Sequence, residues 1–98
     1  MQDIRYDVFQ RAGPGWHPGK SMFEQPAMRE RVAHYRHWLD AGKLDLGGHY
    51  PDAGGGGMMI PIAGISEAEV SRFASEDPAV KSGMLVAEVR PWLIGRSR

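Results

Sequence analysis

Cysteine is absent from the 98 residues of this sequence. Its absence excludes disulfide bonds and thiolate chemistry. An excess of charge of one sign is also missing, because 12 basic side chains balance 12 acidic ones and no block of like charge occurs. A nucleic-acid partner or an acidic membrane surface is therefore not expected.

Long apolar runs are also missing, and no leader segment is expected. The amino terminus reads MQDIRYD, without the basic and apolar regions of a secretory signal, and no stretch of the sequence is typical of a transmembrane span. We therefore expect a soluble cytoplasmic protein with no membrane partner. At this length the chain should form a single domain, residues 1–98, whose modest core would benefit from a dimer partner.

A glycine-rich loop that ends in Gly19, Lys20 and Ser21 resembles part of a nucleotide-binding P-loop. A P-loop requires a glycine five positions before Gly19, but Pro14 stands there. Prolines in the loop also lack the amides that would have to bind phosphate. The loop is longer than most connections between a strand and a helix, which is typical of functional loops. We therefore interpret residues 11–25 as a lid over a binding site.

The spacing of apolar residues predicts the order of the elements. Strands are predicted where apolar residues alternate with others, and helices where apolar residues fall on one face. The predicted strands are 4–10, 43–48, 57–62 and 84–92. The predicted helices are 26–41, with Pro26 in the first turn, a second that begins at a capping box of Ser66 and Glu69, and a short turn over 79–82.

Two local features carry further expectations. Met28, Val32, Tyr35 and Leu39 form one stripe of the first predicted helix at about 100° per residue, and we expect this stripe to face the core. Glycines occupy positions 54–57 between the second and third strands. We expect them to form a mobile hairpin loop and not a ligand cradle.

The element order βαββαβ predicts an α+β fold of the ferredoxin-like type. With right-handed crossovers it gives a four-stranded antiparallel sheet with both helices on one face. The other face has no cover within the chain, and an apolar sheet face left in water would be unusually large. A homodimer packed sheet to sheet is therefore expected. Pro61 falls in a strand that is interior in this plait, so that strand should end or bulge there.

The succession of WLDAGKLDLGG, GGGGMMIPIAGISEAEVSRFASEDPAVKSGM and EVRPW is similar to a known family pattern. Over about residues 26–92, the order and spacing of these segments resemble the YCII-related (YciI-like) family. The resemblance implies a dimeric α+β barrel built on the ferredoxin-like fold. Members of the family include small-molecule enzymes, among them a dehydrochlorinase of chlorinated hydroxyquinols, and many proteins of unknown activity.

The family is thought to use a histidine on the first helix and an aspartate in an Asp-Pro step. Asp77 matches the aspartate, but the position of the histidine falls on Arg31. At the end of the second strand, the Gly-Pro-Phe of the family is replaced by Gly-His-Tyr, which introduces His49. Two explanations follow from the resemblance. Either His34 or His49 takes over proton transfer, or the chemistry of this chain is lost or changed.

Histidine is suited to proton transfer near neutral pH, and a neighbouring carboxylate fixes its tautomer. The candidates for this role are His17, His34 and His49. Asp77 would orient the histidine, or it would serve only as the N-cap of the turn that follows. Trp16 is expected to fold back onto the cleft between the first helix and the sheet, and thereby to bring His17 toward that cleft.

Arg31, Trp16 and Tyr50 are the candidates for substrate contacts. Arg31 could anchor a phenolate or carboxylate because a guanidinium makes bidentate contacts, or it could be an exposed arginine that pairs with a nearby acid. No local cluster has the spacing of metal ligands, so no metal is expected.

The resemblance, together with the histidines and aromatic residues expected around the cleft, implies a small enzyme that moves protons on a compact hydroxylated aromatic or lactone-like metabolite. The expected reactions are elimination, isomerisation or dehydrochlorination, which need no cofactor. The alternative is a non-catalytic ligand-binding or dimeric interaction module on the same fold. Loss of the helix histidine favours this alternative, whereas the histidines and aromatic residues expected around the cleft favour the enzyme.

Overall fold

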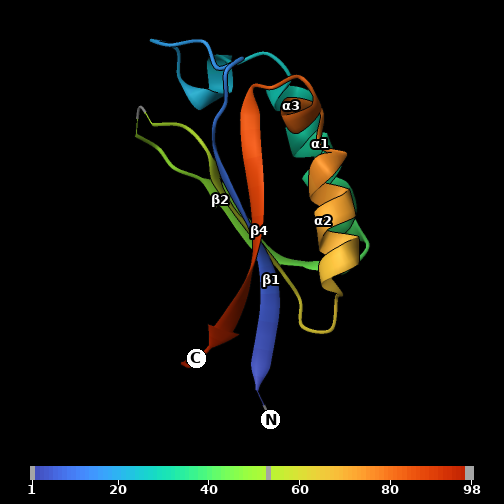
Figure 1. The fold of residues 1–98 in the computed structure, drawn as a ribbon. Coiled ribbons are helices and arrows are strands. Elements are labelled where there is room, and N and C mark those ends of the chain that lie inside the picture. The colour runs from blue at the N-terminus through green and yellow to red at the C-terminus, as the bar shows by residue number, and fades with distance from the viewer. Residues whose placement is uncertain (1, 53, 97–98) are drawn as a thin grey trace.

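The computed structural model describes residues 2–52 and 54–96 (Figure 1). Four strands form one antiparallel sheet, and the helices cover one of its faces. The α+β fold class is thus confirmed. In chain order the elements are β1 (Asp3–Ala12), the 3₁₀ turn η1 (Met22–Glu24), α1 (Met28–Asp40), β2 (Leu44–His49), β3 (Gly57–Pro61), α2 (Glu67–Ser75), α3 (Pro78–Lys81) and β4 (Leu85–Ile94). None of the helices in the described ranges is long and apolar enough to cross a bilayer.

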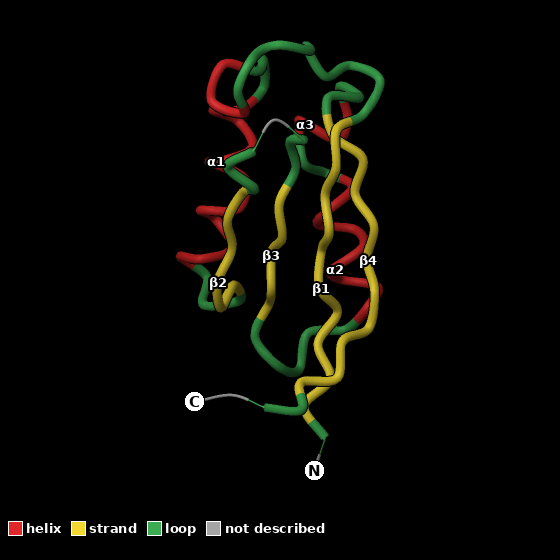
Figure 2. Tube along the Cα trace, turned by 90° about the vertical axis from the view of Figure 1, so that its left-hand side faces the viewer, coloured by secondary structure: helices red, strands yellow, loops and turns green. Residues whose placement is uncertain are grey.

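The strands lie side by side in the order β2-β3-β1-β4 (Figure 2). β1 and β4 pair along their whole length, from Asp3 opposite Ile94 to Ala12 opposite Leu85. This order, with helices on a single face, is compatible with a ferredoxin-like plait. β4 is an edge strand, and its Pro91 is tolerated there because an edge strand has one side without a ladder.

The third strand ends at Pro61, as the sequence predicts. The pairing of β3 with β2 is irregular at the same point, because Leu44 lies opposite Pro61 whereas Leu46 lies opposite Ile60. The proline therefore stands at the end of an interior strand, where its missing amide interrupts no further pairing.

The first helix differs from its prediction in both its start and its buried face. It begins at Met28 and not at Pro26, because Ala27 has a left-handed φ of 65° that separates the helix from the preceding turn. Val32 and Leu39 of the expected core stripe are 51% and 50% exposed. Met28 and Tyr35 of the stripe are buried as predicted, and Arg31 and Trp38 complete the buried face in place of Val32 and Leu39. The apolar pattern therefore predicted two of the four buried positions, and it could not anticipate a buried arginine.

Two clusters of buried apolar side chains hold the helices on the sheet. The larger one joins β1, β3, α1 and α2 through Val8, Tyr35, Trp38, Met59, Val70 and Ala74. Within reach of it, the rings of Trp38 and Phe73 stack at 4.1 Å between centroids, which links α1 to α2. The smaller cluster consists of Met22, Met28, Ala79, Met84 and Leu85.

The predicted capping box at the start of α2 forms only in part. Ser66 Oγ accepts a hydrogen bond from the Glu69 amide at 3.2 Å, so the N-cap itself is confirmed. The carboxylate of Glu69 does not accept the reciprocal hydrogen bond from the backbone amide of Ser66. It pairs with Lys43 Nζ at 2.7 Å, which links α2 to the segment that follows α1.

The glycine run between β2 and β3 is closely packed. Gly55 has a φ of 72°, and a Cβ there would lie 2.6 Å from the indole of Trp16. Gly56 has a φ of 87°, and a Cβ there would overlap the backbone carbonyl of Gln10. Both positions therefore require glycine for close approach as well as for backbone conformation. These contacts fit a packed turn better than the mobile loop expected from the sequence.

Candidate functional site

A cavity of about 320 Å³ lies between η1, α1 and the strands β2 and β3. Apolar side chains form most of its wall: Phe23, Met28, Val32, Tyr35, Leu39, Leu44 and Met59. Its basic lining consists of Arg31, Arg36 and His49, and no carboxylate of the described residues lines it. A cavity of this volume and composition suits a small ligand with an apolar body and a negative or electron-rich group.

A chain of buried polar groups leads from this cavity into the core. Arg31 donates from Nε and Nη2 to Gln10 Oε1 at 2.9 and 2.7 Å. Gln10 Nε2 in turn donates to Asp77 Oδ2 at 2.9 Å. Gln10 and Asp77 are fully buried, and Arg31 is 3% exposed. One amide thus connects a buried guanidinium to a buried carboxylate, which compensates part of the desolvation of both charges.

Asp77 has a second structural role, because its Oδ1 accepts a hydrogen bond from the Ala79 amide at 2.9 Å. This bond makes Asp77 the N-cap of α3, with Pro78 in the first helical turn, as the sequence predicts. The same carboxylate therefore starts α3 with one oxygen and orients Gln10 with the other.

Burial shifts the pKa values of two residues that line the cavity, Arg31 and Tyr35. Burial lowers the pKa of Arg31, and the charge of Asp77 opposes that effect. Arginine nevertheless stays protonated in proteins. Burial, reinforced by the charge of Asp77, raises the pKa of the Tyr35 phenol far above its usual range. Tyr35 is therefore a neutral hydrogen-bond donor at any physiological pH, and its hydroxyl is buried without a partner among the described residues.

The structure separates the candidate histidines. His49, at the end of β2, lines the cavity together with Arg31, and its ring meets Phe23 edge-on at 4.6 Å between centroids. His34 lies between α1 and α2. Its ring stacks on Phe73 at 3.9 Å, and its Nε2 is 2.7 Å from the Phe73 carbonyl oxygen. His34 thus joins the two helices and is not among the side chains that line the cavity.

The loop over residues 11–25 is held by a buried side chain. Gln25, 4% exposed, accepts a hydrogen bond from the His17 amide at 2.8 Å and donates to the His17 carbonyl at 2.9 Å. The side chain of His17 is exposed and does not line the cavity. Trp16 does fold back onto the protein, where it packs on Gly55 and on the cluster around Met28. It does not bring His17 with it.

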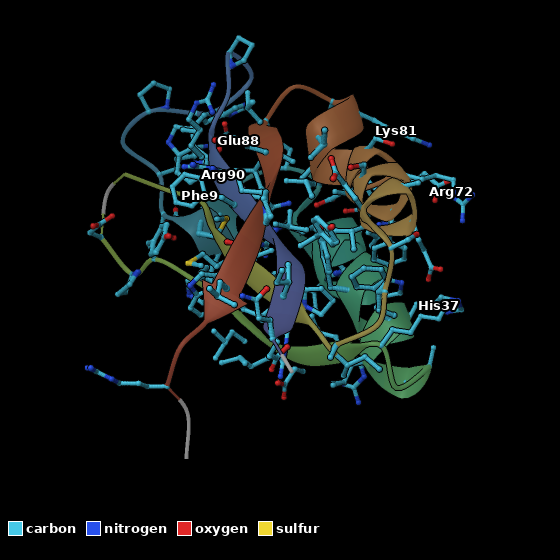
Figure 3. All side chains as sticks on the ribbon, turned by 60° about the horizontal axis from the view of Figure 1, so that its bottom comes forward. Phe9, His37, Arg72, Lys81, Glu88 and Arg90 are labelled. Atoms are coloured by element: carbon cyan, nitrogen blue, oxygen red, sulfur yellow. The ribbon has the colours of Figure 1, made fainter. Side chains whose placement is uncertain are left out.

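Tyr50 belongs to the open face of the sheet. Its ring lies 6.1 Å from that of Phe9, which projects from the side of the sheet away from the helices (Figure 3). Tyr50 also borders a second hollow of about 410 Å³ together with Leu46 and Trp92. His49 lines this hollow as well, so the structure groups His49 with Arg31 in the first cavity and with Tyr50 in the second, and Trp16 lines neither.

Sequence reasoning missed Gln10 and Tyr35 as residues of the site. Tyr35 was assigned to the core, where its ring does lie. Gln10 carried a usable signal, because it lies two positions after Val8 on the inward face of β1, where a polar side chain is unusual. Such a residue predicts a buried hydrogen-bond partner, and Arg31 and Asp77 are those partners.

The arrangement can bind a small anion at Arg31 and can exchange a proton with it at His49. Within the described ranges, no three acidic or histidine side chains gather closely enough to hold a metal ion. A scan against protein-family models, a search of curated proteins and a search of solved structures each found no match to this chain.

Proposed function

We propose that this protein is a small-molecule enzyme of the YciI-like type. It carries out cofactor-free acid–base chemistry on a compact hydroxylated aromatic or lactone-like substrate held between α1 and β2. The observation that carries the proposal is that His49 and Arg31 line the same small, mainly apolar cavity. An imidazole and a guanidinium in one apolar site are the groups that proton abstraction beside a developing oxyanion requires.

In the proposed reaction, a nitrogen of His49 accepts a proton from a C–H or O–H group of the substrate. Arg31 stabilises the negative charge that develops on the neighbouring oxygen. In an elimination the electron pair of the broken C–H bond forms the new double bond, and the leaving group departs as an anion. Asp77 acts at a distance, because it orients Gln10, which orients Arg31.

The family resemblance supports this proposal at the two positions that matter. Arg31 and Asp77 occupy the places of the helix histidine and the aspartate, and the structure buries both and joins them through Gln10. The imidazole that is missing from the helix has a counterpart in His49, on the facing strand. We therefore propose that His49 replaces the family histidine, and that Asp77 orients Arg31 through Gln10 where the family aspartate would act with a histidine.

The test is turnover of a panel of chlorinated hydroxyquinols and small hydroxylated lactones in D₂O. Chloride release and deuterium incorporation would be followed by ion chromatography and mass spectrometry. His49→Gln should lower the rate by about 100-fold or more, which is the contribution of a general acid or base. His37→Gln changes an exposed histidine of α1 and should leave the rate unchanged. Full activity of the His49 variant would refute the proposal.

One structural observation also favours the non-catalytic alternative. Both oxygens of Asp77 are engaged within the protein and the side chain is fully buried, so it contacts no ligand directly. A pure binding module would retain ligand through Arg31 and turn over no member of the panel. Detectable turnover that depends on His49 would exclude this alternative.

We also propose that the open face of the sheet is buried in a homodimer. Phe9, Glu88 and Arg90 lie on this face, opposite the helix layer that carries His37 and Arg72 (Figure 3). Trp92 on the same face is 44% exposed. A large aromatic side chain beside acidic and basic groups is typical of a surface that pairs with its own copy.

A further inference from the structure

Tyr35 has a feature that the proposed chemistry does not use. Its ring packs edge-on against Trp38 and Phe73, with centroids 6.4 and 5.4 Å apart, and the residue is 4% exposed. Its hydroxyl is nevertheless buried without a partner among the residues that the structure describes. A buried hydroxyl is normally hydrogen-bonded, because leaving it unpaired is destabilising. Tyr35 is one of the residues that line the cavity, and a ligand there that reaches the hydroxyl supplies the missing acceptor.

The charges around Tyr35 define which acceptor is favoured. The guanidinium of Arg31 lies over the Tyr35 ring, with its central carbon 5.9 Å from the ring centroid. The hydrogen bonds of Arg31 to Gln10 use Nε and Nη2, so Nη1 is the guanidinium nitrogen that is left to donate to a ligand. Arg36 adds a second positive charge to the wall, and no described carboxylate lines the cavity. An anionic oxygen is therefore favoured over a neutral one.

We propose that this cavity binds small organic monoanions, carboxylates or phenolates with a flat apolar body, and that Tyr35 donates a hydrogen bond to the anionic oxygen beside Arg31. This inference rests on the proposed function, since it names the substrate class of the same cavity. The apolar body packs between the methionine and aromatic side chains of the wall. Because burial raises the pKa of the phenol, Tyr35 keeps its proton and acts as a donor at every pH of interest.

The test compares an anion with a neutral molecule of the same shape. Isothermal titration would measure the binding of benzoate and of benzamide to the 98-residue chain. We expect benzoate to bind at least about tenfold more tightly, as befits hydrogen bonds to a charged acceptor. Tyr35→Phe should weaken benzoate binding by about fivefold or more and leave benzamide binding nearly unchanged. Tyr6→Phe is the matched control, because Tyr6 packs on the same core but does not line the cavity.

Folding is checked by circular dichroism, and Tyr35→Phe should retain stability because it removes only an unpaired hydroxyl. Arg36→Gln is a second test at an exposed position, and it should weaken benzoate binding selectively. Wild-type protein that does not bind benzoate at millimolar concentration, equal affinity for benzamide, or unchanged benzoate affinity in Tyr35→Phe would each overturn the inference.

The two proposals fail separately. Benzoate binding that depends on Tyr35, together with full turnover in His49→Gln, would overturn the catalytic role of His49 and support the anion site. Turnover that is lost in His49→Gln, without any preference for benzoate over benzamide, would overturn the anion site alone.

Discussion

Asparagine in place of Asp77 tests whether the hydrogen bonds that join Arg31, Gln10 and Asp77 require a fixed order of donors and acceptors. Arg31 can only donate hydrogen bonds, Gln10 accepts at one end and donates at the other, and Asp77 accepts on both oxygens. The new amide has one acceptor, which the Ala79 amide requires. Its NH₂ group would then face the NH₂ group of Gln10. If the Gln10 amide rotated by half a turn, its NH₂ group would face Arg31, which can only donate. No orientation of the two amides therefore gives every donor an acceptor.

The expected loss of stability follows from this mismatch. Removing one partner of a buried charge pair costs about 3–5 kcal/mol, and a buried donor without an acceptor costs about 1–3 kcal/mol. These two contributions overlap, and an amide separates the two charges, so we expect Asp77→Asn to lower the free energy of unfolding by about 3 kcal/mol. An ordinary N-cap would behave differently, because asparagine and aspartate cap helices about equally well.

Urea unfolding at neutral pH measures this loss. The protein concentration must be the same for every variant, because dissociation of a dimer would also shift the midpoint. The double variant Gln10→Glu with Asp77→Asn provides the rescue. Its new carboxylate can accept from Arg31 and from the new amide, whose oxygen still caps α3. We expect the double variant to recover most of the lost stability.

The single variant Gln10→Glu completes the cycle. It places a second carboxylate against Asp77 and should be destabilised near neutral pH. The coupling free energy between positions 10 and 77 should then exceed about 1.5 kcal/mol. Two results would refute the fixed order of donors and acceptors from Arg31 to Asp77. One is a loss of less than about 1 kcal/mol in Asp77→Asn, and the other is a double variant no more stable than Asp77→Asn alone.

Two further predictions concern the phenol and the open face. Because the pKa of Tyr35 is raised, the folded state keeps a proton that the unfolded chain loses above about pH 10, so stability falls as the pH rises through that range. Urea unfolding between about pH 8 and about pH 11 should show a shallower fall for Tyr35→Phe, and equal slopes would contradict the argument. Light scattering after gel filtration should show a wild-type dimer that Trp92→Asp dissociates. Val32→Asp, which changes an apolar position of α1 that is 51% exposed against 44% for Trp92, should leave the dimer intact. A monomeric wild-type protein would exclude the sheet-to-sheet dimer.

Local features of this fold could be predicted from the sequence. The alternation in β1, the N-caps at Ser66 and Asp77, and the end of β3 at Pro61 depend on a few neighbouring residues. The backbone preferences of such residues act over one or two turns of chain. Their positions were therefore visible without any knowledge of the packing.

Which side chains of α1 face the sheet, and which residues line the cavity, could not be predicted in the same way. An apolar stripe placed Val32 in the core, whereas the structure buries Arg31 beside it. Arg31 is buried where Gln10, 21 positions away along the chain, accepts its hydrogen bonds. Gln10 in turn donates to Asp77, which is 67 positions from it. No local pattern reports a hydrogen bond between residues so distant in sequence.

The sequence by itself determined the order of the helices and strands and the α+β class, and the family resemblance singled out positions 31 and 77 as candidates. The tertiary structure alone decided that His49 and not His34 or His17 lines the cavity with Arg31, and that Asp77 reaches Arg31 through Gln10. The physical reason is that caps and periodicities arise from neighbouring residues, whereas a binding cavity and a buried charge depend on which distant side chains the fold brings together.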